Sequence, residues 1–170
     1  MNILQEALIS LLSGLTTKTG NEIHWKDKYG NPITIEPIDI DQCKYIVRSY
    51  WRHGIKGCET EYKNKDKHGN NIIWYNNGIK CLEEKYINGL RNGKTIEYYS
   101  DGQKFRITGY QNNLRHNKTI VWYKSGVIRE EATYKNGLSD GQHIIFDETG
   151  KKILEEEYIN GIKVRIIKCQ

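Results

Sequence analysis

The sequence predicts an all-β fold: an elongated single antiparallel sheet of stacked β-hairpins, with a short N-terminal amphipathic helix as a cap. Composition favours this fold, because the β-forming residues Ile and Tyr occur 24 and 12 times in 170 residues, whereas Ala occurs twice. Glycines and two aromatic series also recur with a period of 24 residues. A fixed period of this length is the signature of stacked structural repeats.

The repeat runs in one register without insertion. The recurrent glycines are Gly30, Gly54, Gly78, Gly102, Gly126 and Gly150. Four positions before the last five of them stand the aromatic residues Tyr50, Trp74, Tyr98, Trp122 and Phe146. A second aromatic series, each member followed two positions later by Asn, consists of Tyr62, Tyr86, Tyr110, Tyr134 and Tyr158. We interpret these glycines and aromatic residues as structural positions, and residues 50–165 as five repeats.

Two segments precede the repeats. Residues 1–20 contain an apolar stripe at helical spacing, which predicts the amphipathic helix: Ile3, Leu4, Ala7, Leu8, Leu11, Leu12 and Leu15. The helix either caps the sheet or binds a partner. Residues 21–49 alternate in the manner of strands with an interruption at Pro37, which predicts a degenerate first hairpin. Residues 166–170 are interpreted as a C-terminal tail.

Each repeat is predicted to contain two strands and two turns. Asn-Gly pairs at 88–89, 136–137 and 160–161 are strong hairpin signals, because both residues tolerate the positive φ of a tight turn. A second turn is predicted at Gly78 and at its copies. With strands about 4.8 Å apart, each repeat advances about 10 Å and five repeats extend roughly 50 Å.

Period-2 alternation divides the first strand of each repeat between two faces of the sheet. One face carries the pairs Ile72/Trp74, Ile96/Tyr98, Ile120/Trp122 and Ile144/Phe146. The other carries Ile73/Tyr75, Glu97/Tyr99, Val121/Tyr123 and Ile145/Asp147. The first set is more uniformly apolar, so we expect it to form the buried ladder and the second set to face solvent.

The pattern W-Y-x-x-G, an acidic residue and then Y-x-N-G resembles the MORN repeat variant family, which includes the YwqK-like antitoxins. Trp74 to Gly78, with Glu83 and Tyr86 to Gly89, resembles a complete unit. The third unit departs from the pattern, with Ile107 in place of the glutamate and Asn112-Asn113 in place of Asn-Gly. The resemblance implies an extended sheet of hairpins and a role in protein association or membrane apposition.

No residue pattern points to catalysis. His68 and His116 share a frame position but lie two repeats apart, about 20 Å, which is too far to share a metal ion. Adjacent glutamates point to opposite faces of a strand and therefore cannot form a catalytic pair. Instead, the series Glu59, Glu83, Glu131 and Glu155 is expected to pair with lysines on neighbouring strands. We therefore expect no enzyme activity, catalytic residue, metal or cofactor.

The cysteines and the apolar segments bear on location. Cys43, Cys58, Cys81 and Cys169 match no metal or redox spacing and are interpreted as free thiols, with a bridge between Cys58 and Cys81 left open. No apolar run reaches the roughly 18 residues that a membrane-spanning helix needs. Glu6 precedes the one apolar N-terminal stretch, where a secretion signal would have Lys or Arg. We expect a cytoplasmic protein, or one in the host cytoplasm if the chain is viral.

The sequence favours a protein-binding scaffold. Tyrosine supplies large contact area at low entropy cost, so the predicted partner-binding residues are Tyr75, Tyr99, Tyr123 and Glu97. An antitoxin or immunity-like inhibitor is one form of this function, and its partner would be another protein. The alternatives are a binder of anionic lipid or nucleic acid and a self-associating structural protein. Residues 51–170 carry 21 basic and 15 acidic side chains, interleaved in sequence, which weakens the charge as a functional signal.

Overall fold

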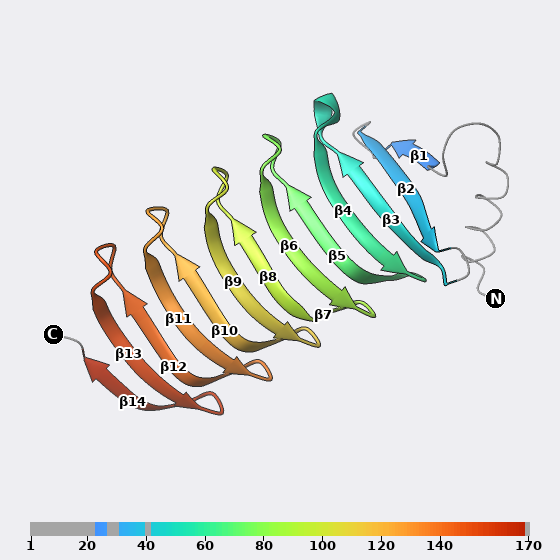
Figure 1. The fold of residues 1–170 in the computed structure, drawn as a ribbon. Coiled ribbons are helices and arrows are strands. Elements are labelled where there is room, and N and C mark those ends of the chain that lie inside the picture. Colours follow the sequence, from blue (N-terminus) through green and yellow to red (C-terminus); the bar gives the residue numbers. More distant parts are fainter. Residues whose placement is uncertain (1–22, 27–30, 40–41, 169–170) are drawn as a thin grey trace.

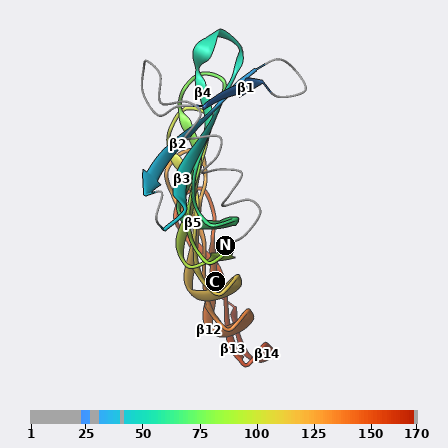
Figure 2. The same ribbon diagram turned by 90° about the vertical axis from the view of Figure 1, so that its right-hand side faces the viewer.

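The protein is one open antiparallel β-sheet. The structure, a computed structural model, describes residues 23–26, 31–39 and 42–168, and these form 14 strands in a single sheet (Figure 1). Turned by 90°, the sheet is seen as one thin, twisted layer (Figure 2). The predicted fold class is therefore confirmed. The predicted N-terminal helix lies outside the described residues.

The strands follow one another across the sheet in chain order, and β7 alone lies off this path, beside β6. They are β1 (Ile23–Lys26), β2 (Pro32–Asp39), β3 (Lys44–Tyr50), β4 (Lys56–Lys63), β5 (Asp66–Trp74), β6 (Lys80–Ile87), β7 (Leu90–Arg91), β8 (Gly93–Tyr98), β9 (Lys104–Gln111), β10 (Leu114–Trp122), β11 (Ile128–Lys135), β12 (Leu138–Phe146), β13 (Lys152–Ile159) and β14 (Ile162–Lys168). A 3-10 turn spans Arg52–Gly54. Residues 21–49 thus contribute β1, β2 and all of β3 except Tyr50, and these strands continue the sheet of the repeats.

One long edge of the sheet carries the glycine turns. The Gly78 N–H donates to the Tyr75 carbonyl at 3.0 Å, and the Tyr75 N–H donates to the Ile79 carbonyl at 2.8 Å. Gly78 has a φ of +83°, a conformation that L side chains rarely adopt. The same two bonds recur around Gly102, Gly126 and Gly150, which confirms the predicted turn.

The opposite edge carries the Asn-Gly hairpins. Asn88 and Gly89 have φ of 49° and 78°, as a two-residue hairpin with the twist of the sheet requires. The Gly89 N–H also donates to the Lys67 carbonyl of the preceding hairpin at 2.9 Å, and the equivalent bonds from Gly137 and Gly161 measure 2.8 Å. Each hairpin loop is therefore bonded to the one before it.

Each of the first four repeat units runs for 24 residues from its aromatic residue, so that these units are 50–73, 74–97, 98–121 and 122–145, and the fifth begins at Phe146. Near the Asn-Gly edge, the ladder of the first, second and fourth units contains a bulge with a glycine of positive φ: Gly69, Gly93 and Gly141. A Cβ at each of these glycines would meet the side chain of Glu61, Lys85 or Thr133, respectively.

In the third unit the glycine stands on the first strand of the pair instead of the second. Asn117 occupies the bulge with a φ of 66°, and the residue opposite it is Gly109. A Cβ at Gly109 would collide with the backbone carbonyl of His116. In each of the first four units one of the two facing positions is therefore glycine, and this glycine can stand on either strand.

The two faces are named by their commonest residues: the Ile face carries Ile72, Ile96 and Ile120, and the Thr face carries Thr60, Thr95 and Thr119. The predicted burial was wrong. From β4 to β13 the buried side chains all lie on the Thr face: Thr60, Asn71, Thr95, Thr108, Thr119, Val121, Ala132 and Glu156. The predicted apolar ladder is half-buried throughout.

This reversal follows from the single layer. Among the described residues, no second layer covers the Ile face, so long apolar side chains there keep part of their surface exposed. Threonine and alanine extend only a short distance from the sheet, and longer side chains on neighbouring strands cover them. On the Thr face these include Tyr110 and Tyr134, whose rings lie under the guanidinium groups of Arg91 and Arg115 at 4.3 Å.

Candidate functional site

The predicted partner-binding tyrosines lie on the Thr face and connect successive repeats. The hydroxyl groups of Tyr75, Tyr99 and Tyr123 donate to the backbone carbonyls of Tyr98, Trp122 and Phe146 at 2.7, 2.9 and 2.9 Å. Trp51 occupies the same frame position, and its Nε1–H donates to the Trp74 carbonyl at 3.0 Å. These side chains thus hold each glycine turn against the next one, and their binding of a partner stays a prediction.

The carboxylate of Glu97, the fourth predicted partner-binding residue, is bound by an arginine of the neighbouring strand. Arg106 on β9 donates from Nε to Oε1 at 2.8 Å and from Nη2 to Oε2 at 2.9 Å. This bidentate geometry fixes both side chains. The structure does not gather Glu97 and the three tyrosines into one cluster, since the tyrosines stand about 10 Å apart along the sheet.

The first aromatic series lies on the Ile face, where Tyr98 is bonded to the preceding unit. Its hydroxyl donates to Glu83 Oε1 at 2.5 Å. Burial and this bond to the Glu83 carboxylate together raise the pKa of Tyr98 to about 12. Burial raises the pKa of the Glu83 carboxyl, but the Tyr98 hydroxyl and Lys80 outweigh it, and the net pKa lies below its usual value.

The glutamate series binds cations in a way that differs from the prediction. Glu83 and Glu155 pair with Lys80 and Lys152, three residues earlier on the same strand, at 3.2 and 2.6 Å. The reason is the bulge at this point of β6 and β13, where the register shifts opposite Trp74 and Phe146. The bulge adds a residue, so side chains three positions apart reach the same face.

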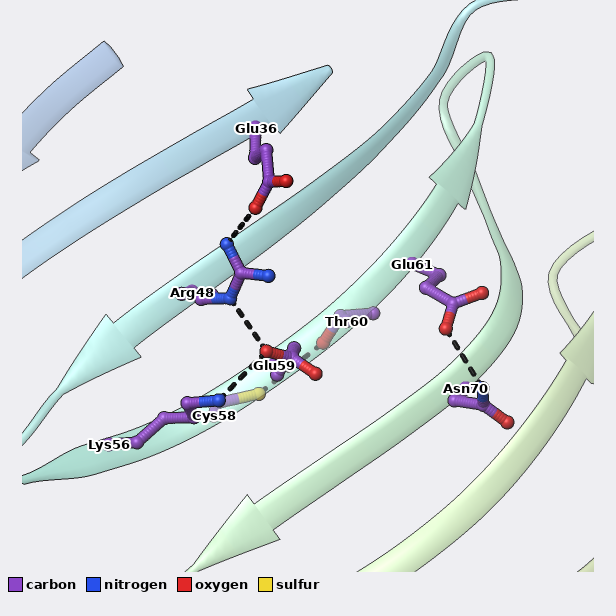
Figure 3. A network of polar contacts seen from close by, with 8 residues as sticks. All are labelled: Glu36, Arg48, Lys56, Cys58, Glu59, Thr60, Glu61 and Asn70. Carbon is purple, nitrogen blue, oxygen red and sulfur yellow. Dashed lines mark hydrogen bonds and ion pairs between the residues drawn. The ribbon is translucent and has the colours of Figure 1, made fainter. Parts of the chain in front are cut away.

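Glu59 alone combines both arrangements (Figure 3). Its carboxylate accepts from Lys56 of the same strand at 3.0 Å and from Arg48 Nε of β3 at 2.6 Å. The Arg48 guanidinium also binds Glu36 on β2. This partly exposed network connects β2, β3 and β4. We therefore interpret it as a structural feature at the start of the repeats.

Two of the histidines have a structural role that the sequence did not predict, although their shared frame position was visible. The backbone N–H of Asn88 donates to His68 Nδ1 at 3.3 Å, and that of Asn136 donates to His116 Nδ1 at 3.4 Å. At the same frame position Asp140 accepts from the Asn160 N–H at 3.3 Å. The available signal was that His68, His116 and Asp140 all carry a hydrogen-bond acceptor.

The described parts of the chain contain no group of three His, Cys, Asp or Glu side chains arranged to hold a metal ion. Cys43, Cys58 and Cys81 are free thiols, as predicted. Among the described residues, no helix has the length and apolar character to cross a membrane.

The Ile face has a regular row that is interrupted once. Direct register pairs run from Ile72 on β5 to Glu155 on β13 and alternate isoleucine with glutamate: Ile72, Glu83, Ile96, Ile107, Ile120, Glu131, Ile144 and Glu155. Ile107 replaces the glutamate of the third unit. Three isoleucines therefore stand side by side on β8, β9 and β10.

A second row on the same face lies one step closer to the Asn-Gly edge. Its central members are Lys94, Gly109 and Lys118, with Lys94 directly opposite Gly109. A groove of about 470 Å³ lies over Gly109, which contributes no side chain to it, and is lined by Lys94, Ile107, Lys118 and Ile120. A neighbouring groove of about 430 Å³ lies over Ile96 on the other side of Lys94.

The two lysines at the groove are exposed and form no ion pair within the described part of the chain. Elsewhere on the Ile face, Lys56, Lys80 and Lys152 each pair with a glutamate. The groove therefore combines an apolar floor with two uncompensated positive charges. Such a site suits an anionic group attached to an apolar one.

Comparison with known proteins supports the repeat assignment. The profile of the MORN repeat variant matches residues 115–136, which run from β10 through the Gly126 turn to the end of β11. The search of curated proteins found no match to the chain. The resemblance to the MORN repeat variant is thus confirmed for this hairpin, and the other units share its frame of aromatic, glycine and asparagine residues.

Proposed function

We propose that the chain is a non-enzymatic scaffold that binds another protein through its sheet. The observation that carries this proposal is a stripe of exposed leucines on the Ile face at the Asn-Gly edge. Leu90, Leu114 and Leu138 are 40%, 48% and 52% exposed and occupy the same frame position in the second, third and fourth units. Together with the three adjacent isoleucines, they give this face an apolar surface of the kind that marks protein interfaces.

The repeat geometry supports a rigid role. Hydroxyl groups, hairpin N–H groups and register pairs bond each unit to the next, so the rows on each face keep a constant spacing. A pre-organised surface of this kind loses little conformational entropy when a partner docks. The predicted second surface, with Tyr75, Tyr99, Tyr123 and Glu97 on the Thr face, remains part of the proposal.

The specific form that we propose is an antitoxin or immunity-like inhibitor that sequesters a protein in the cytoplasm. The resemblance to repeats found in YwqK-like antitoxins supports this form. Its discriminating observation is the neighbourhood of the coding sequence, where a reading frame for a toxin-like protein is expected. Co-expression of that protein with the chain should restore growth that the protein alone prevents.

The test of scaffold function begins with affinity capture on the immobilised full chain from its native host. Each retained protein is then purified, and its binding is measured by calorimetry. Saturable binding with a defined stoichiometry, weakened in a Leu114→Asp/Leu138→Asp variant, is the expected result. If no purified protein binds saturably, or if the variant binds as tightly as the original chain, the proposal fails.

A second candidate, binding to an anionic lipid or nucleic-acid surface, is favoured by one observation. Lys85, Lys94 and Lys118 are all exposed on the Ile face. Binding of this kind weakens steeply between low and physiological salt. Sedimentation with vesicles of phosphatidylserine and phosphatidylcholine, or with RNA, at low salt would reveal it, and no binding under those conditions would eliminate it.

A further inference from the structure

The departures of the third unit from the repeat converge on one place in the structure. Ile107 removes a glutamate, Gly109 removes a side chain and Asn117 takes the glycine position of the bulge. All three residues line the 470 Å³ groove. The first, second and fourth units show that the sheet forms with a glutamate, a side chain and a bulge glycine at these positions. The fold therefore does not require the three departures of the third unit.

We propose that this groove docks an acidic segment of the partner protein. An apolar side chain of the segment lies on Ile107 and Ile120, in the space that Gly109 leaves open, and flanking carboxylates bind Lys94 and Lys118. This inference rests on the proposed scaffold function and assigns its docking point and the chemistry of its partner.

Charge selects an acidic occupant. Lys94 and Lys118 stand two strands apart, on either side of Gly109, which is about 10 Å at ordinary strand spacing. Side chains on one face of an extended segment stand two residues apart, so two carboxylates that flank an apolar side chain on that face are four residues apart, about 13 Å. Because lysine side chains are long and flexible, a segment that crosses the strands can place one carboxylate on each lysine and the apolar side chain between them.

The surroundings favour a narrow segment over an anionic membrane surface. Glu83 and Glu131 stand in the same row as the three isoleucines, on the strands just outside them. A broad anionic surface laid on this face would approach both carboxylates together with the lysines. A single segment seated in the groove contacts the lysines and leaves the glutamates aside.

The test uses the immobilised full chain and a phage library of random peptides of about 12 residues, which reach roughly 40 Å when extended. Selected peptides are synthesised with a fluorescent label, and their affinities are measured by anisotropy. We expect selection of peptides in which Asp or Glu flanks Leu, Ile or Phe. Failure to enrich acidic peptides with an apolar residue overturns the inference.

Two variants test the contacts directly. Charge reversal in Lys94→Glu/Lys118→Glu should weaken the selected peptides at least about tenfold, because both charge pairs become repulsive. The matched control is Lys65→Glu/Lys135→Glu, which makes the same change in net charge at exposed hairpin positions. Equal losses in the two variants would indicate a long-range charge effect and would overturn the assignment to the groove.

A third variant fills the groove without breaking the fold. Gly109→Thr/Asn117→Gly gives the third unit the Thr-Gly arrangement of Thr133 and Gly141 in the fourth. We expect a native circular dichroism spectrum and at least about tenfold weaker peptide binding. Unchanged binding in this variant overturns the inference.

The proposed function is judged separately with its purified protein partner. If that partner binds the original chain and both groove variants equally, the scaffold function stands and the groove assignment fails. Vesicles of phosphatidylserine and phosphatidylcholine in equal parts complete the test. Binding that the charge reversal abolishes, with no acidic peptide selected, would replace the protein segment by a lipid headgroup and overturn the proposal.

Discussion

The third and fourth units share strand lengths and glycine turns, yet the groove of about 470 Å³ in the third corresponds to a recess of only about 30 Å³ beside Thr133 in the fourth. In the fourth unit Glu131 and Thr133 project from β11, and Gly141 lies on β12 across from Thr133. In the third unit the corresponding pair is Gly109 and Asn117, and Ile107 replaces the glutamate. The comparison teaches that the space across the bulge admits one side chain from the two facing positions. Either of the two strands can supply that side chain, provided that the other has glycine.

The largest expected loss of stability comes from placing a side chain at both facing positions of the third unit. Gly109→Thr alone should lower the free energy of unfolding by about 2 kcal/mol or more, because its Cβ would collide with the rigid His116 carbonyl. Urea unfolding followed by circular dichroism measures the loss. Adding Asn117→Gly should recover at least half of it in a double-mutant cycle. Additive losses would show that the two positions are independent.

The reverse change in the fourth unit is the matched control. Thr133→Gly removes a side chain without creating a collision, so it should cost only about 0.5–1 kcal/mol from the greater freedom of the unfolded chain. A loss equal to that of Gly109→Thr would contradict the steric explanation.

The tyrosine hydroxyl bonds that link successive units should contribute equally to stability in the third and fourth units. Tyr99→Phe and Tyr123→Phe each remove one hydroxyl donor to a backbone carbonyl, so each should cost about 1 kcal/mol in urea unfolding. Tyr110→Phe, at a tyrosine whose hydroxyl has no hydrogen bond within the described chain, should be nearly neutral. An unchanged unfolding free energy in Tyr99→Phe and Tyr123→Phe would contradict the role of these hydroxyls in linking the repeats.

Alkaline pH should remove a stabilising contribution of Tyr98 at the start of the third unit. The start of the fourth unit should lose no such contribution, because Trp122 stands there in place of the tyrosine. In the folded protein the pKa of Tyr98 is about 12, whereas in the unfolded chain a tyrosine has a pKa near 10. This contribution to stability is complete below pH about 10 and is lost as the pH rises through about 12.

Tyr98→Phe should therefore reduce the decline in unfolding free energy between these two pH values. Burial and Glu84 also raise the pKa of Tyr86 to about 12, so Tyr86 contributes a further part of the slope and Tyr86→Phe is the matched substitution. An unchanged slope in the Tyr98 variant would contradict the prediction.

The smallest effect on stability is expected where the effect on binding is largest. Ile107→Glu restores the glutamate of the other units, three residues after Lys104, in the spacing at which Lys80 pairs with Glu83. The unfolding free energy should change by less than about 0.5 kcal/mol, because the position is half-exposed and the new pair is weak. Peptide binding in the groove should be lost. A large loss of stability would mean that Ile107 is a core residue.

The sequence predicted the architecture well because the repeat determines it. The positive φ at Asn88 and Gly89 and the turn at Gly78 follow from local chemistry that a periodic pattern displays directly. Burial was predicted wrongly, because hydrophobicity alone ranked Ile72 and Trp74 above Thr60 and Thr95. In a single layer without a cover, side-chain length and the reach of neighbouring side chains decide exposure.

The candidate site was visible in the sequence only as irregularity. Ile107 and Asn117 could be recognised as departures from the frame, but their meeting at Gly109 depends on the bulge register between β9 and β10. Likewise, no pattern indicated that the hydroxyls of Tyr99 and Tyr123 would bond the next turn, because that contact links residues 23 positions apart in sequence.

The bonding of each hairpin to its immediate neighbours also has an evolutionary consequence. Since a unit contacts only the units beside it, a duplication of residues 98–121 would insert a second copy of the groove about 10 Å further along the sheet. Neither copy would need changes elsewhere in the chain. Recognition sites on such a sheet can therefore be gained, lost or multiplied one unit at a time, with the unit as the heritable module.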